Sequence, residues 1–96
     1  KYDDILYLES SKRLIYLHLT DEQKENKCFY AVMAELEEQL ALAGFLRVHK
    51  SYLVNMRYIE KLNYNGVVLV NKEELPISQK RYSEIKALHL QWRSRQ

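Results

Sequence analysis

Glycine, proline and cysteine are scarce in this sequence of 96 residues, and each scarcity excludes a class of protein. Two glycines and one proline leave little room for flexible linkers. Neither Gly44 nor Gly66 belongs to a glycine-rich loop of the kind that holds a nucleotide phosphate. The single cysteine, Cys28, excludes a disulfide within the chain and a zinc site built on cysteines. No apolar run approaches the roughly 18 residues of a transmembrane helix, so we expect no membrane span.

Residues that could carry out catalysis are also few. No serine lies in the glycine-flanked turn of a hydrolase nucleophile, and Cys28 has no histidine near it in the sequence. The three histidines, His18, His49 and His89, are widely spaced, which is more typical of unrelated side chains than of a metal site. We therefore interpret the chain as a non-enzymatic domain that needs no cofactor and no metal.

The charge is unevenly distributed, although the net charge is only +2. Residues 1–44 carry nine Asp and Glu against five Lys and Arg, whereas residues 45–96 carry ten Lys and Arg against four Asp and Glu. A basic half favours a polyanionic partner. Lysine and arginine spread over exposed elements for solubility would give the same composition, so charge alone does not decide between the two interpretations.

Short strands joined by tight turns dominate the hydrophobic pattern. Strands are predicted at residues 5–8, 13–19, 28–30, 45–49, 58–63, 67–70 and 74–77. Helical spacing predicts helices over residues 31–43 and 79–92, the second with Ser78 as its N-cap. Residues 51–55 are predicted to form a bend or a short helical turn, and Asn65-Gly66 is the strongest signal for a hairpin turn. This inventory predicts a mainly β fold of antiparallel sheets with one or two helices packed on them.

Three of the predicted loops, at residues 10–13, 49–51 and 78–81, carry cationic or polar tips. Lysine and arginine suit phosphate oxygens or guanine edges, whereas glutamine and asparagine suit adenine. Each loop alone is best explained as an ordinary hydrophilic turn, but three together with a basic half favour binding to DNA.

A different interpretation comes from the tyrosines. Tyr7, Tyr16, Tyr58 and Tyr64 lie in or beside predicted strands, and bases of single-stranded RNA stack on such exposed aromatic side chains. A non-catalytic protein-interaction module or a single-stranded RNA-binding module that uses a tyrosine-rich sheet face is therefore the alternative. Tyrosine is also common on small sheets that have one face in water.

The phrase at residues 44–55, Gly-Phe-Leu-Arg-Val-His-Lys-Ser-Tyr-Leu-Val-Asn, resembles the LytTR family of bacterial transcription regulators. The opening phrase at residues 4–10, the helix around residues 36–40, Tyr58-Ile59 and the closing phrase at residues 75–81 follow the order of that family. The resemblance therefore covers almost all of residues 1–96.

The resemblance implies a fold of stacked antiparallel β-sheets that acts in the cytoplasm as the output domain of a two-component response regulator. Such domains bind repeated sites on double-stranded DNA by inserting loops into successive major grooves, without a recognition helix. The implied partners are an upstream receiver domain, its cognate histidine kinase and, on the DNA, a second copy of the domain. Family members usually have another strand upstream of Asp4, so we expect the chain to be a fragment without that strand and the receiver domain.

Carried over residue by residue, the groove-facing positions are Lys12, Lys50 and Lys80. The lesser candidates for contacts to phosphates or bases are Arg13, His49, Ser51, Asn55, Arg57, Gln79 and Arg81. Arg47 and His49 either contact DNA or support their loop by hydrogen bonding, and for Arg47 we favour the supporting role.

Overall fold

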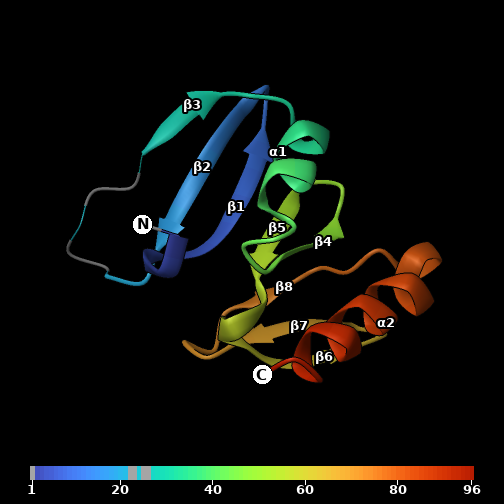
Figure 1. Cartoon of the computed structure of the whole chain (residues 1–96). Coiled ribbons are helices and arrows are strands. Elements are labelled where there is room, and N and C mark those ends of the chain that lie inside the picture. Colours follow the sequence, from blue (N-terminus) through green and yellow to red (C-terminus); the bar gives the residue numbers. More distant parts are fainter. Residues whose placement is uncertain (1, 22–23, 25–26) are drawn as a thin grey trace.

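The computed structural model describes residues 2–21, 24 and 27–96, which form two antiparallel sheets and two α-helices (Figure 1). The larger sheet has the order β3-β2-β1-β5-β4, with β1 (Ile5–Ser11), β2 (Leu14–Leu19), β3 (Cys28–Tyr30), β4 (Phe45–His49) and β5 (Tyr52–Asn55). The smaller sheet consists of β6 (Ile59–Asn63), β7 (Gly66–Leu69) and β8 (Glu74–Leu75). The helices are α1 (Met33–Leu40) and α2 (Tyr82–Arg93), with short 3-10 turns η1 (Tyr2–Asp4), η2 (Met56–Tyr58) and η3 (Gln79–Arg81). The mainly β fold of stacked antiparallel sheets with two helices is thereby confirmed. Within the described residues no helix is long and apolar enough to cross a membrane.

The five-stranded sheet is the middle layer of the molecule, and both faces of its strands β1, β5 and β4 are covered, whereas β3 is exposed. Leu6 and Tyr7 of β1 pack toward the smaller sheet and α2, whereas Ile5 and Leu8 pack toward α1. This double coverage explains why residues 5–8 are a continuous apolar run rather than an alternating one.

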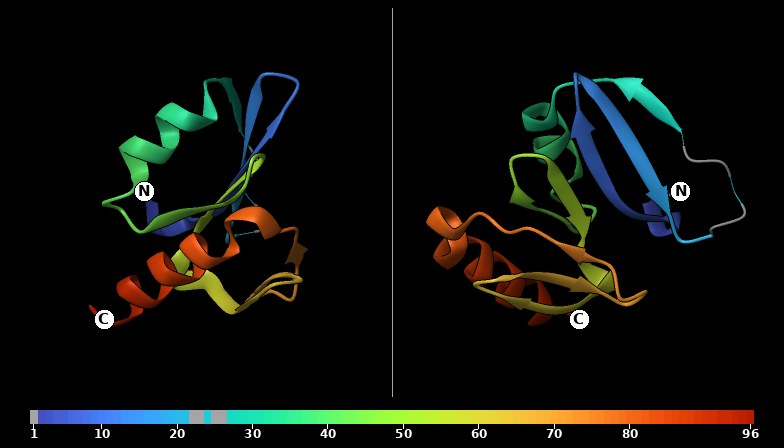
Figure 2. Two further views of the ribbon diagram at one scale, coloured as in Figure 1. Left: turned by 90° about the vertical axis from the view of Figure 1, so that its right-hand side faces the viewer. Right: turned by 180° about the vertical axis from the view of Figure 1, so that it is seen from behind.

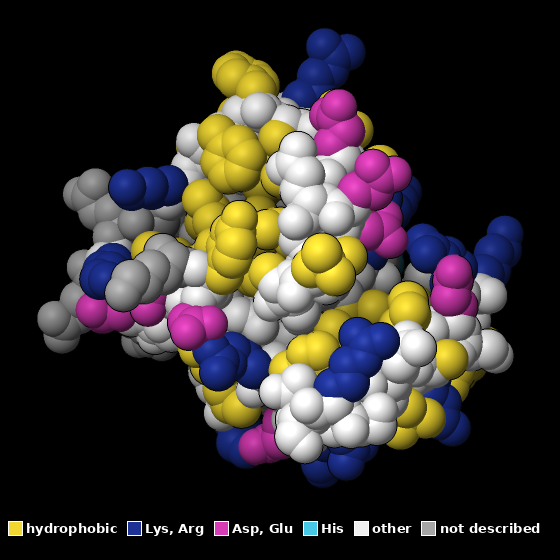
Figure 3. All heavy atoms as spheres, in the orientation of Figure 1, with side chains coloured by type: hydrophobic (Ala, Val, Ile, Leu, Met, Phe, Trp, Pro, Cys, Tyr) yellow, Lys and Arg dark blue, Asp and Glu magenta, His cyan; other side chains and the backbone are white. Residues whose placement is uncertain are grey.

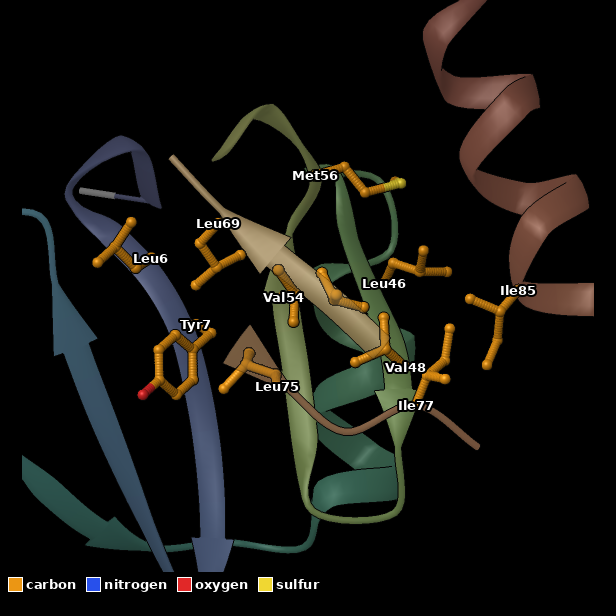
Figure 4. Packing of buried hydrophobic residues seen from close by; sticks show 11 residues of the cluster. Leu6, Tyr7, Leu46, Val48, Val54, Met56, Leu69, Leu75, Ile77 and Ile85 are labelled. Atoms are coloured by element: carbon orange, nitrogen blue, oxygen red, sulfur yellow. The ribbon is translucent and has the colours of Figure 1, made fainter. Parts of the chain in front are cut away.

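The core between the two sheets holds β4 and β5 in place. Val48 and Val54 of these strands are fully buried, and Figure 4 shows them facing Leu75 of β8 and Ile85 of α2. Burial of each such aliphatic side chain contributes roughly 1.5–3 kcal/mol. The turn between β4 and β5 therefore projects from a rigid base.

Of residues 51–55, predicted as a bend or a short helical turn, residues 52–55 instead form strand β5 between β1 and β4. Leu8 pairs with Leu53, and Leu46 pairs with Val54. The prediction was wrong because both faces of this short strand are buried, so it shows neither the alternation nor the length by which a strand is recognised.

Two of the tight turns differ from expectation in the residues that form them. Lys12 and Arg13 alone connect β1 to β2, and both have positive φ (50° and 71°), the backbone of a type I′ hairpin turn that usually takes Asn or Gly. In the β6–β7 hairpin, Asn63 pairs with Gly66, so the turn consists of Tyr64 and Asn65 rather than the predicted Asn65-Gly66. Gly66 is required for another reason: a Cβ there would lie 2.9 Å from the carbonyl oxygen of Leu75.

The helices are shorter than predicted. Helix α1 covers Met33–Leu40, and the chain turns at Gly44, where φ is +90° and a Cβ would lie 3.1 Å from Nε1 of Trp92. The second predicted helix divides into η3 and α2, and the Ser78 side chain makes no capping hydrogen bond. Ser78 therefore precedes a tight turn that leads into α2.

Candidate nucleic-acid interface

Three cationic segments lie side by side along one edge of the molecule. The Ser10 amide N–H donates to the carbonyl oxygen of Ser51 at 2.8 Å, and the Ser78 amide N–H donates to the carbonyl oxygen of Val48 at 2.7 Å. These bonds attach the β1–β2 hairpin and the segment before η3 to the two sides of the β4–β5 hairpin. Figures 1 and 2 show the three turns following one another from top to lower right in Figure 1. We call residues 10–13, 49–51 and 78–81 the basic row.

The cations of the basic row are available to a ligand. Lys12, Arg13, Lys50 and Lys80 are exposed, and none of them forms an ion pair with a described residue. Arg81 is also exposed, although its Nε donates to Glu84 at 3.0 Å. The arrangement presents a line of positive charge whose tips are ammonium and guanidinium groups, which is suited to an extended polyanion.

Beside these cations, His49 and Arg47 support the β4–β5 turn. Nδ1 of His49 accepts the Ser51 amide N–H at 3.1 Å, which requires a ring with no proton on that nitrogen. Burial lowers the pKa of His49, and the neighbouring Lys50 and Arg47 lower it further, so the ring is neutral near pH 7. The Arg47 guanidinium is bonded to the carbonyl oxygen of Lys50. Both residues therefore hold the turn.

Asn55, one of the predicted contact residues, is buried in the structure. It is only 3% exposed, and its amide donates to the carbonyl oxygens of Tyr2 at 3.2 Å and Ile5 at 3.0 Å. These bonds join the N-terminal segment to the end of β5, so the Asn55 side chain cannot reach a nucleic acid. Arg57 lies just beyond, at the end of β5 opposite the basic row, and is paired with Asp3.

The other polar residues of the basic row are partly engaged with their neighbours. Gln79 is exposed, but its Nε2 donates to the carbonyl oxygen of Tyr64 at 3.4 Å. The ring of Tyr64 in turn packs edge-on against the ring of Tyr82. Ser51 contributes its backbone to the contacts with Ser10 and His49. The structure thus brings together all the predicted contact residues except Asn55 and Arg57.

The tyrosine-rich face is occupied by contacts within the protein. Tyr7 is 4% exposed, and its hydroxyl donates to a Glu73 oxygen at 2.9 Å. The Tyr52 hydroxyl donates to Glu9 at 3.3 Å, and the other Glu9 oxygen contacts His18 at 2.9 Å. Burial, together with the nearby carboxylates, raises the pKa of both tyrosines. Two carboxylates beside a buried tyrosine would repel RNA at this part of the sheet.

Sequence reasoning missed Glu37. This residue lies on α1, and its carboxylate pairs with Arg47 of β4 at 3.2 Å. Together with Glu35 and Glu38 it gives the helix sequence an acidic side, which is typical of side chains that face water. No signal in the sequence connects it to the β4–β5 turn, because the pairing depends on how α1 packs over the sheet.

Comparison with known proteins identifies the family and the fold. A model of the LytTr DNA-binding domain family matches residues 1–89. A search of curated proteins finds no match. Among solved structures, the LytTr DNA-binding domain of a methyl-accepting/DNA response regulator from Bacillus cereus aligns with a TM-score of 0.76 and 23% identity, over 91% of this chain and 82% of that chain. The structural likeness supports the fold, and since the family match spans most of the sequence, the chain belongs to the LytTR family of DNA-binding domains.

Proposed function

We propose that residues 1–96 form a domain that binds double-stranded DNA at specific sequences and thereby regulates transcription. The observation that carries the proposal is the basic row, in which backbone hydrogen bonds from Ser10 to Ser51 and from Ser78 to Val48 join three cationic turns. Membership of the LytTR family and the likeness to a DNA-binding domain of a response regulator support the same function.

The domain that carries the basic row is about as long as one helical turn of B-DNA. The molecule measures 32 × 24 × 24 Å along its principal axes, and successive major grooves on one side of B-DNA are about 34 Å apart. In this arrangement Lys12, Lys50 and Lys80 reach base edges from successive turns. The remaining exposed residues of the row contact phosphates, which fix position without reading sequence.

We further infer that the domain is the output half of a cytoplasmic bacterial response regulator. A receiver domain would supply the signal after phosphorylation by a histidine kinase, and repeated DNA sites would hold two copies. The resemblance to the family supports this assignment.

The test is selection of bound sequences from a random duplex library, followed by titration of a selected and a scrambled duplex. A directly repeated motif and tighter binding of the selected duplex are expected. Lys50→Ala and Lys80→Ala should each cost about 1–3 kcal/mol of binding free energy on the selected duplex. The matched control is Arg57→Ala, which removes a cation from the opposite end of β5 and should leave affinity within about twofold. Unchanged affinity in both lysine variants would exclude the basic row as the binding site.

A further inference from the structure

The β4–β5 turn lacks the backbone conformation that normally closes a two-residue hairpin. His49 pairs with Tyr52, which leaves only Lys50 and Ser51 in the turn. Turns of this length usually adopt type I′ or II′, both of which need a positive φ at the first turn residue. Lys50 and Ser51 both lack one. The Tyr64-Asn65 turn lacks one as well, and the β4–β5 pairing has a register shift between Arg47 and His49. Side-chain bonds to the β4–β5 turn therefore add to what its backbone pairing fixes.

Arg47 supplies the principal bond of this kind. Its Nη2 donates to the carbonyl oxygen of Lys50 at 2.9 Å, and its Nη1 donates to Oε1 of Glu37 at 3.2 Å. One planar guanidinium thus connects α1 to the turn, a geometry that the ammonium of lysine cannot reproduce. The Arg47 side chain is only 18% exposed, and Glu37 opposes its charge, so it is poorly placed to bind a phosphate itself.

Close packing alone does not fix the guanidinium. Its Nε is buried and has no hydrogen-bond partner among the described residues, and Arg47 borders a hollow of about 150 Å³ whose lining includes Glu37, Leu88 and Trp92. An unpaired buried N–H is unfavourable, and the hollow offers the side chain another place to lie. The two hydrogen bonds to Glu37 and Lys50 are therefore what hold the guanidinium in its observed position.

We propose that Glu37 and Arg47 are positioning residues, which fix the Lys50 carbonyl and thereby aim the Lys50 side chain at its base. This inference rests on the proposed function. Through Glu37, helix α1 would then contribute to recognition of the DNA sequence without contacting the DNA itself.

The first experiment measures affinity for the selected and the scrambled duplex in Arg47→Lys and Glu37→Gln. Arg47→Lys keeps the charge but loses the bridge, so binding to the selected duplex should weaken by about tenfold or more, because a hydrogen bond to a charged group is lost. Binding to the scrambled duplex should stay within about twofold, since phosphate contacts persist. Glu37→Gln should show a smaller loss of the same kind.

The matched control is Glu38→Gln. It removes the same charge from the same helix, and Glu38 is exposed and forms no hydrogen bond or ion pair with a described residue. The ratio of affinities for the two duplexes should not change in this variant.

Two further readouts separate positioning from other roles. Lys50→Ala should cost much less in the Arg47→Lys background than in the wild type, because the lysine is already misplaced. If the losses of affinity in the two variants add up and the salt slope is reduced, Arg47 contacts DNA directly. If affinity falls equally on both duplexes and the unfolding temperature is lower, the role of Arg47 is purely structural. Either result overturns the proposal.

Amide hydrogen exchange of the free domain tests the inference without DNA. The Ser51 amide should exchange at least several-fold faster in Arg47→Lys than in the wild type, and unchanged exchange would refute the positioning role. A wild-type domain that binds no duplex would instead refute the proposed function.

Discussion

At the scale of single residues, the β1–β2 turn combines an unfavourable backbone with two free cations. Lys12 and Arg13 both occupy the left-handed region, which costs roughly 1–2 kcal/mol per residue for side chains other than Gly, Asn and Asp. Strain of this kind is often stored at functional sites. The side chains at this tip are therefore better explained by a binding role than by the stability of the turn.

Replacing the tip with Lys12→Asn and Arg13→Gly should raise the free energy of unfolding by about 1 kcal/mol, because Asn-Gly fits a type I′ turn. The same double variant should bind DNA more weakly, since it lacks two cations of the basic row. Urea denaturation and a DNA titration measure the two effects, and Arg13→Gly alone, which keeps Lys12, is the control. A double variant that is less stable than the wild type would contradict the conformational explanation.

The neutral ring of His49 predicts a pH dependence of stability. Its pKa in the folded protein lies below the ordinary 6.5 because of burial and the nearby Lys50 and Arg47. Well above pH 6.5 the ring is neutral in both the folded and the unfolded protein, so its full contribution to the free energy of unfolding is present. Below that pH the unfolded chain takes up the proton more readily, and stability falls as the pH approaches the folded-state pKa. His89 is shifted in the same direction by burial and Arg93, so it contributes to the same loss.

Urea denaturation at pH 7.5 and 5.5 checks this sign. The wild type should lose more stability on acidification than His49→Gln, and His89→Gln should remove the second part of the loss. Identical losses in the wild type and both variants would show that neither histidine is responsible.

At the scale of elements, helix α1 places negative charge next to the basic row. Glu35 and Glu38 are exposed on it, and Figure 3 shows acidic side chains gathered along the side of this helix. Such charges limit how DNA can approach the edge of the sheet, because like-charged surfaces repel. The helix can therefore guide orientation without making a contact.

The double variant Glu35→Gln and Glu38→Gln should bind every duplex a few-fold more tightly at low salt, with no change in the preference for the selected sequence. The gain should disappear as added salt screens the repulsion. A titration of both duplexes at two salt concentrations measures this effect. A change of preference would mean that α1 touches the DNA.

The elements also show how far the sequence could predict the fold. Strands β2 and β6 and the end of the helix before Gly44 were recoverable because each leaves a local pattern in the sequence. Strand β5 was missed because its pairing with β1 joins residues more than forty positions apart, as in Leu8 with Leu53. The buried role of Asn55 was missed for the same reason, since its partners Tyr2 and Ile5 are distant in sequence.

At the scale of the whole molecule, the three turns of the basic row lie next to one another because of the topology of the fold, which includes the strand order of the larger sheet. Local sequence predicted polar tips, but only the placement of β5 between β1 and β4 brings Ser10 next to Ser51. The family resemblance implied only that loops enter the grooves of DNA, not which strands hold them together. A composition with a net charge of +2 carried no such information.

The basic row predicts a salt dependence much steeper than the net charge suggests. If its five exposed cations, Lys12, Arg13, Lys50, Lys80 and Arg81, all met phosphates, the logarithm of affinity would fall with a slope of about −4.5 against the logarithm of salt concentration. Affinity would then drop several-hundred-fold between about 50 and 200 mM salt.

Cations that contact bases instead of phosphates make the salt slope shallower than about −4.5. Each lysine variant therefore shows whether that lysine contacts a phosphate or a base. A lysine on a phosphate reduces the slope by about one when replaced by alanine and weakens all sequences alike, whereas a lysine on a base relaxes specificity at one position. The measurement is a titration at four salt concentrations with the wild type, Lys50→Ala and Lys80→Ala. A wild-type slope near zero would contradict the basic row as a whole, because an exposed line of cations cannot bind a phosphate backbone without displacing its counterions.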